Sequence, residues 1–139
     1  MKFSGIVFTP VSHIFCFLTQ PLRCHGHRVT VWCAVSRVGI IGPYFFQENN
    51  HAVTVTSDRY VSMLREFFMP ALNDMSLDNG TVWFQHDGAT AHTSRMSMGF
   101  LREAFPDRLI SLRRGDINGP ARSPDLAPCD YFLWGYPYL

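Results

Sequence analysis

Two aspartates in this sequence stand where carboxylates could meet at one edge of a sheet. Asp87 closely follows a strand-like segment at 81–85, and Asp130 falls in the first turn of a helix expected at about 128–134. Ligands of open α/β sheets gather outside the carboxyl ends of the strands. Carboxylates there could hold divalent ions that activate an attacking oxygen and stabilise a leaving one in phosphodiester cleavage. Mg²⁺ prefers oxygen ligands of this kind.

Each candidate residue also has a plain structural interpretation. Asp87 precedes Gly88, and an Asp-Gly pair after a strand is a common turn signal. A carboxylate in the first turn of a helix, as Asp130 would be, complements the helix dipole. His92, five residues after Asp87, could bind metal or phosphate, or it could serve as a hydrogen-bonding residue of the fold. Local sequence leaves both interpretations open for all three residues.

The composition suits one folded domain with little overall attraction to nucleic acid. The chain has 139 residues, of which 47% are hydrophobic and 14% aromatic, enough for a packed core. Its formal net charge is only +1, although eleven of the twelve cations are arginines. Binding to DNA would therefore depend on local arginine clusters. No stretch approaches the ~20 apolar residues that span a bilayer, so no membrane association is expected.

The hydrophobic pattern predicts an α/β fold. A nearly continuous run rich in β-branched residues at 28–36 is typical of a strand buried on both faces, and 39–42 is expected to turn the chain back into a hairpin partner. Ser57 is expected to cap a helix that Pro70 kinks or ends. The segment 20–27, with its Pro, Gly and His residues, is expected to be a break. Further strands are expected at 3–8, 43–47, 81–85 and 108–112, and further helices at about 93–105 and 128–134.

Four segments, in this order along the chain, resemble mariner-type DNA transposases of the DDE/D endonuclease superfamily. The segments 29–46 and 60–72 are similar to the family core, 84–94 (FQHDGATAHTS) to its second catalytic motif, and 121–135 (ARSPDLAPCDYFLWG) to its third. The resemblance implies an RNase H-like mixed sheet flanked by helices. It also implies a single catalytic-type domain over 1–139, lacking the N-terminal helix-turn-helix domain with which such transposases find their terminal repeats.

The resemblance implies roles for individual residues. Asp87 and Asp130 would be the second and third metal ligands, holding Mg²⁺ or Mn²⁺, with His92 beside the site and Arg122 near DNA phosphate. The partner would be DNA, namely transposon ends. A homodimer, as in related transposases, and a nuclear location are also implied.

The first catalytic position departs from the family. The family pattern has Phe-Thr/Ser-Asp-Glu, but this chain has Pro10 where the aspartate belongs and Val11 where the glutamate belongs. No acidic residue precedes Glu48, so the first strand offers no substitute carboxylate. The segment between Phe15 and Val29 is also shorter than in the family. The sheet is therefore expected to be truncated in its second-strand region, either lacking a strand or rebuilt by 16–27.

The leading hypothesis is a degenerate transposase catalytic domain that no longer cleaves or transfers DNA strands. One alternative is an active Mg²⁺-dependent endonuclease in which Glu48 completes the metal site. Another is a non-catalytic DNA- or protein-interaction module or a zinc module, although the spacing of its cysteines and histidines fits no standard zinc finger. The zinc ligands of that module would be Cys16, Cys24, His25, His27 and Cys33.

Overall fold

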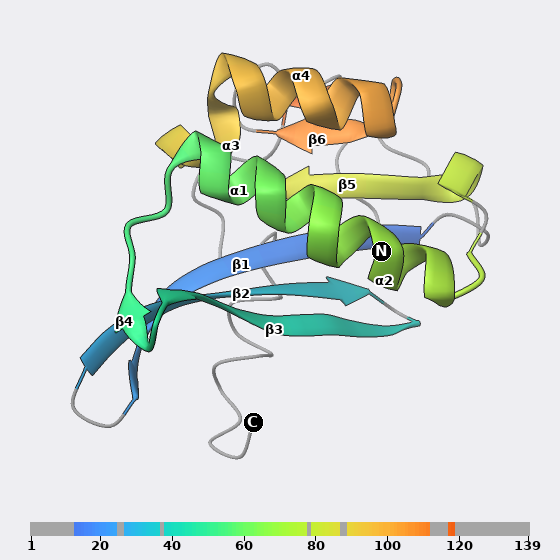
Figure 1. Ribbon diagram of the computed structural model, residues 1–139. Coiled ribbons are helices and arrows are strands. Elements are labelled where there is room, and N and C mark those ends of the chain that lie inside the picture. Colours follow the sequence, from blue (N-terminus) through green and yellow to red (C-terminus); the bar gives the residue numbers. More distant parts are fainter. Residues whose placement is uncertain are drawn as a thin grey trace.

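The computed structural model describes residues 13–24, 27–36, 38–77, 79–86, 89–111 and 117–118. A seven-stranded mixed sheet lies at its centre, with strand order β4-β3-β2-β1-β5-β6-β7. Figure 1 labels β1 to β6. The strands are β1 (His13–Cys24), β2 (His27–Ser36), β3 (Gly39–Glu48), β4 (His51–Ala52), β5 (Val82–His86), β6 (Leu109–Ser111) and β7 (Ile117–Asn118).

The direction of the strands determines which chain segments meet at each edge of the sheet. Strands β1, β2 and β3 pair antiparallel in sequence order, whereas β5 pairs parallel to β1 and β6 pairs parallel to β5. Strands β1, β3, β5 and β6 consequently run in one direction. Residues that follow β5 emerge at its carboxyl edge, where α/β sheets place their ligands.

The antiparallel half of the sheet confirms one sequence prediction and corrects two. The strand expected at 28–36 is β2. The break expected at 20–27 is wrong for residues 20–24, because β1 continues to Cys24 and Pro21 pairs with Thr30 of β2, while residues 25–26 lie outside the described residues. Strand β5 pairs with β1 only as far as Cys16, so Pro21 has a strand neighbour on one side among the described residues and its missing N–H is tolerated. The turn expected at 39–42 is also wrong, since these residues belong to β3.

These findings decide between the two expectations for the shortened region. The sheet does not lack a strand there, because the segment 16–27 supplies most of β1 and the first residue of β2. Cross-strand pairing with β2 outweighs the local turn signals of the segment.

One helical run crosses the sheet after β4. It consists of α1 (Ser57–Met63), a π-helical segment, Leu64–Phe68, and α2 (Met69–Asp74). Its N-cap is Thr56 rather than Ser57, because the Thr56 side chain accepts a hydrogen bond from the backbone N–H of Arg59. Pro70 does not end this helical run. It lies at the start of α2, directly after the π-helical segment, and the wider π turn accommodates the backbone hydrogen bond that proline, which has no N–H, cannot donate.

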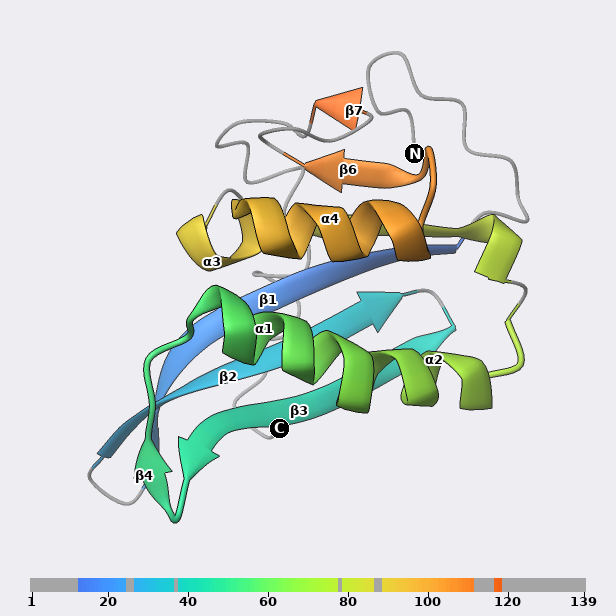
Figure 2. The ribbon, with the colours of Figure 1, turned by 45° about the horizontal axis from the view of Figure 1, so that its top comes forward.

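The described helices pack on one face of the sheet (Figure 2). They enclose an aromatic core. After β5 come α3 (Thr90–Thr93) and α4 (Arg95–Ala104), and α4 lies beside α1. Trp32, Phe68, Phe84 and Phe105 are all fully buried and stack at edge-to-face or tilted angles. Burial of one such ring stabilises the fold by roughly 1.5–3 kcal/mol.

The predicted strand at 3–8 and the predicted helix at 128–134 lie outside the described residues. None of the helices that the structure describes has the length and apolar character that a membrane crossing requires.

Candidate functional site

The candidate site begins where β5 ends. His86, the last residue of β5, is only 5% exposed, and the next residue in the sequence is Asp87. Asp87 lies outside the described residues, as do Pro10, Arg122 and Asp130. The approach of Asp87 to Asp130 therefore stays a prediction, while the surroundings of His86 can be described directly.

His92 connects the end of β5 to the first helix. Its ring stacks on Tyr60 of α1, with centroids 4.3 Å apart and planes at 28°, and lies 5.8 Å from the ring of His86 at 16°. His92 is buried, with 3% of its surface exposed. The resemblance expects this histidine beside the site, and the structure places it against the last residue of β5. Three near-parallel rings thus join β5, α3 and α1.

The neighbouring strand β1 brings no carboxylate to this place. The parallel register pairs His13 with Val82 and Cys16 with Gln85, so Phe17 is the β1 residue that continues the register beside His86. The whole of His13–Cys24 contains neither Asp nor Glu. The resemblance locates the missing aspartate at Pro10, three residues before β1 begins. Neither Pro10 nor Phe17 is acidic, so the sequence has no carboxylate at either of these two positions.

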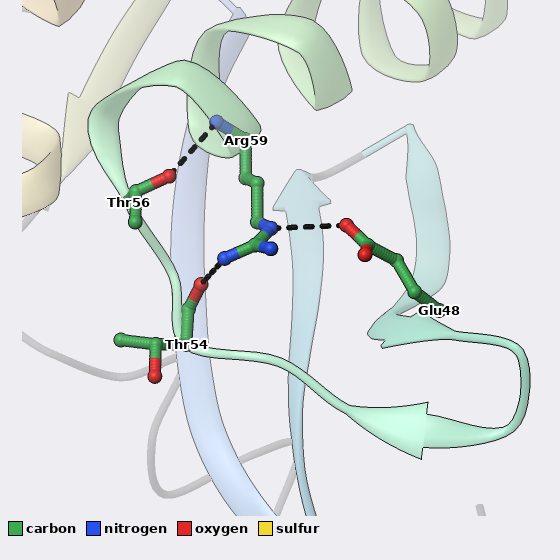
Figure 3. A network of polar contacts seen from close by, with 4 residues as sticks. All are labelled: Glu48, Thr54, Thr56 and Arg59. Atoms are coloured by element: carbon green, nitrogen blue, oxygen red, sulfur yellow. Dashed lines mark hydrogen bonds and ion pairs between the residues drawn. The ribbon is translucent and has the colours of Figure 1, made fainter.

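Glu48, the residue that would complete the metal site in the alternative hypothesis, lies away from the end of β5. It ends β3, which β2 and β1 separate from β5, and strand spacings of ~4.8 Å place β3 roughly 14 Å from β5. The Glu48 Oε1 atom accepts a hydrogen bond from Arg59 Nε at 3.1 Å (Figure 3). Arg59 Nη1 also donates to the carbonyl oxygen of Thr54 at 3.0 Å. The carboxylate therefore braces the connection between β4 and α1.

The Glu48→Gln substitution is expected to lower the free energy of unfolding by no more than about 1 kcal/mol. The Glu48 and Arg59 side chains are 62% and 37% exposed, so water screens their attraction. Urea unfolding at low and high salt measures the effect, which should shrink as ionic strength rises. Glu66→Gln, an exposed carboxylate in the π-helical segment, is the control. A loss of several kcal/mol at Glu48 alone would contradict a purely bracing role.

A cavity of about 580 Å³ opens beside His92. The start of β2, the connection 52–55 and residues 89–92 form its described walls. Arg28 is the one charged side chain among these described lining residues. A second groove, of about 380 Å³, lies between α1 and α4 and contains both acidic and basic side chains. Sequence reasoning missed the first cavity, because its walls come from three distant segments.

The described residues do not supply a complete set of ligands for Mg²⁺. Two-metal cleavage requires several carboxylates from converging elements, and β1 contributes none. Within the described ranges, no cluster of three or more His, Cys, Asp or Glu side chains is arranged to hold a metal ion. Of the predicted zinc ligands, Cys33 is a buried free thiol, and desolvation raises its pKa, which disfavours the thiolate that binds zinc.

Comparison with solved structures finds the same fold in mariner transposase structures. A structure of the Mos1 transposase catalytic domain with raltegravir and Mn matches 90% of this chain and 58% of its own, at 22% identity and a TM-score of 0.66. A crystal structure of the catalytic domain of Mos1 mariner transposase gives 22% identity and 0.63 over 91% of this chain and 58% of its own. A Mos1 paired-end complex with the left transposon end gives 21% and 0.62 over 91% and 41%.

Together these findings establish the fold. The chain spans less than two thirds of the length of the structures it matches and has their α/β, RNase H-like arrangement. No protein-family model matches the sequence, and no curated protein does. The predicted fold class is confirmed.

Proposed function

We propose that this chain is a mariner-type transposase catalytic core that has lost the ability to cleave DNA. The ancestral activity is DNA strand cleavage and transfer at transposon ends. Asp87 and Asp130 are the remaining metal ligands, and Arg122 contacts DNA phosphate near them. When bound, Mg²⁺ or Mn²⁺ would supply the charge that activates the attacking oxygen. In this chain the ion has two of the three anionic partners that the family provides.

The fold and the order of the motifs support the transposase part of the proposal. Strand β5 ends one residue before Asp87, as the second catalytic motif requires, and His92 of the same motif packs against His86. The similar solved structures are Mos1 transposase catalytic domains and complexes with a transposon end, some containing Mn or Mg. DNA is accordingly the proposed partner, with a homodimer and a nuclear location as further parts of the proposal.

One observation carries the loss of cleavage. The β1 strand runs alongside β5 and offers no carboxylate at any residue from His13 to Cys24, and none precedes it in the sequence. Glu48, the first acidic residue, is engaged with Arg59 at the end of β3. Losing one of three carboxylates removes much of the negative charge that holds two divalent ions together, and the catalytic step is lost with it.

Nicking of supercoiled plasmid tests the proposal. The purified chain is expected to leave the plasmid intact in Mg²⁺ and in Mn²⁺, at the level of the Asp87→Ala variant, because neither protein assembles the metal pair. Gel quantification of relaxed circles measures the result, and thermal unfolding confirms that both proteins are folded. Metal-dependent nicking by the unmodified chain that Asp87→Ala abolishes would replace the proposal with an active endonuclease.

A further inference from the structure

The groove of about 380 Å³ between α1 and α4 forms an open face of the helical layer. The two helices lie side by side and run in the same direction (Figure 1, Figure 2). Met96 of α4 lines the groove and is 46% exposed, although its side chain is large and apolar. Exposed apolar surface with polar residues around it is typical of a protein contact surface.

Four charged side chains mark the two ends of this groove. Asp58 and Arg95 lie in the first turns of α1 and α4, whereas Arg65 and Glu103 lie about two turns further along. Each end therefore has one charge of each sign. All four residues are exposed, and within the described part of the chain none of them forms an ion pair. Their charges are available to a partner.

The charge pattern along α4 is symmetric about Gly99. Arg95 precedes Gly99 by four residues and Glu103 follows it by four, so the three residues share one face of the helix. The two charged residues are separated by ~12 Å along the helix axis, whereas ion pairs within a helix join residues three or four apart. An added Cβ at Gly99 meets no atom within 4 Å, so the middle of the face is open to another helix.

The balance and order of the charges select a second copy of this chain as the partner. Equal numbers of acidic and basic residues give little attraction to DNA phosphates. A second copy turned about a two-fold axis through Gly99 presents the same charges in reversed order. Arg95 then faces Glu103 of the second copy, and one axis forms this pair twice. The dipoles of the two α4 helices also oppose each other in this arrangement, which favours it.

We infer that two copies of this chain associate through the α1–α4 groove, with α4 antiparallel on α4 and Gly99 at the crossing point. The inference rests on the homodimer of the proposed function, to which it adds the surface and the symmetry. It depends on neither cleavage nor metal. Two short helices form a small interface, so the dissociation constant is expected to be on the order of 10–100 µM.

Sedimentation equilibrium at concentrations around that value tests the inference. Arg95→Glu or Glu103→Arg alone should weaken association about tenfold or more, because each puts two like-charged pairs across the interface. An equimolar mixture of these two variants should form a heterodimer, since every acidic residue at 95 or 103 then faces an arginine. Glu66→Arg, the same reversal at an exposed residue outside the groove, is the matched control and should change association less than about twofold.

Filling the groove tests the close approach at Gly99. Gly99→Trp should abolish association while circular dichroism shows an intact fold, because the new side chain enters open space. The inference is overturned if the mixed variants remain monomeric, if Glu66→Arg weakens association as much as Glu103→Arg, or if Gly99→Trp still dimerises.

The outcomes also separate this inference from the proposed function. A dimer that survives all these variants refutes the groove and leaves the proposed homodimer standing, whereas a chain that is monomeric at every concentration refutes both. Plasmid nicking is scored separately and decides the proposed loss of cleavage whatever the state of association.

Discussion

Replacing Phe68 with alanine is expected to lower the free energy of unfolding by about 3–5 kcal/mol. Phe68 is fully buried, and its ring centroid lies 5.5 Å from that of Trp32, 5.8 Å from Phe84 and 6.3 Å from Phe105. The substitution removes the transfer free energy of one ring and leaves a void that three rigid neighbours cannot fill. Because native domains are stable by only about 5–15 kcal/mol, this loss is a large fraction of the total free energy of unfolding.

Urea unfolding followed by tryptophan fluorescence and circular dichroism measures this loss. Phe45→Ala provides the matched control, because Phe45 is 40% exposed on β3 and its removal leaves no enclosed void. The control should lose less than about 1.5 kcal/mol. Equal losses at the two positions would show that Phe68 is not at the centre of the core.

A Gly42→Ala substitution is expected to destabilise the protein by about 2–3 kcal/mol. Gly42 has φ = +126°, a backbone conformation that side-chain-bearing residues rarely adopt. An added Cβ would also lie 3.1 Å from the carbonyl oxygen of Trp32 and 3.2 Å from Cys33 Sγ. Backbone strain and close contacts act together there, where β3 approaches an irregularity in its pairing with β2.

Gly99→Ala should instead raise the free energy of unfolding. Gly99 lies within α4, and an added Cβ meets no atom within 4 Å, so the gain is about 0.5–1 kcal/mol from reduced freedom of the unfolded chain. Thermal unfolding of the two variants gives the comparison directly. A stabilising Gly42→Ala would contradict the backbone geometry of β3.

Sequence patterns predicted the elements whose signals are local. The run at 28–36 is almost entirely β-branched or apolar, and the segment at 81–85 matches β5 (Val82–His86) to within one residue. The sequence patterns failed where pairing between strands decides the conformation of the backbone. Pro21 signals a break, yet β1 passes through it because β2 supplies a complete antiparallel partner.

The candidate site was predictable in its chain position but not in its surroundings. Asp87 follows β5 in sequence, and the resemblance predicts His92 beside it. The structure stacks His92 near His86, the last residue of β5, whereas its place beside Asp87 stays a prediction. No local pattern could indicate that Tyr60 completes this stack or that Arg28 reaches the cavity beside it. Such contacts depend on the order of strands in the sheet, which a residue-by-residue pattern does not specify.

The parallel pairing of β1 with β5 has a consequence for how the polypeptide folds during synthesis. His13 and Val82 are neighbours in the sheet although about 70 positions separate them along the chain. The β1–β2–β3 meander consists of near-neighbour contacts and is expected to form early, whereas joining β5 must first close a long loop. A nascent chain that has not yet delivered β5 exposes one side of β1 as an unprotected edge, so aggregation on the ribosome competes with completion of the sheet.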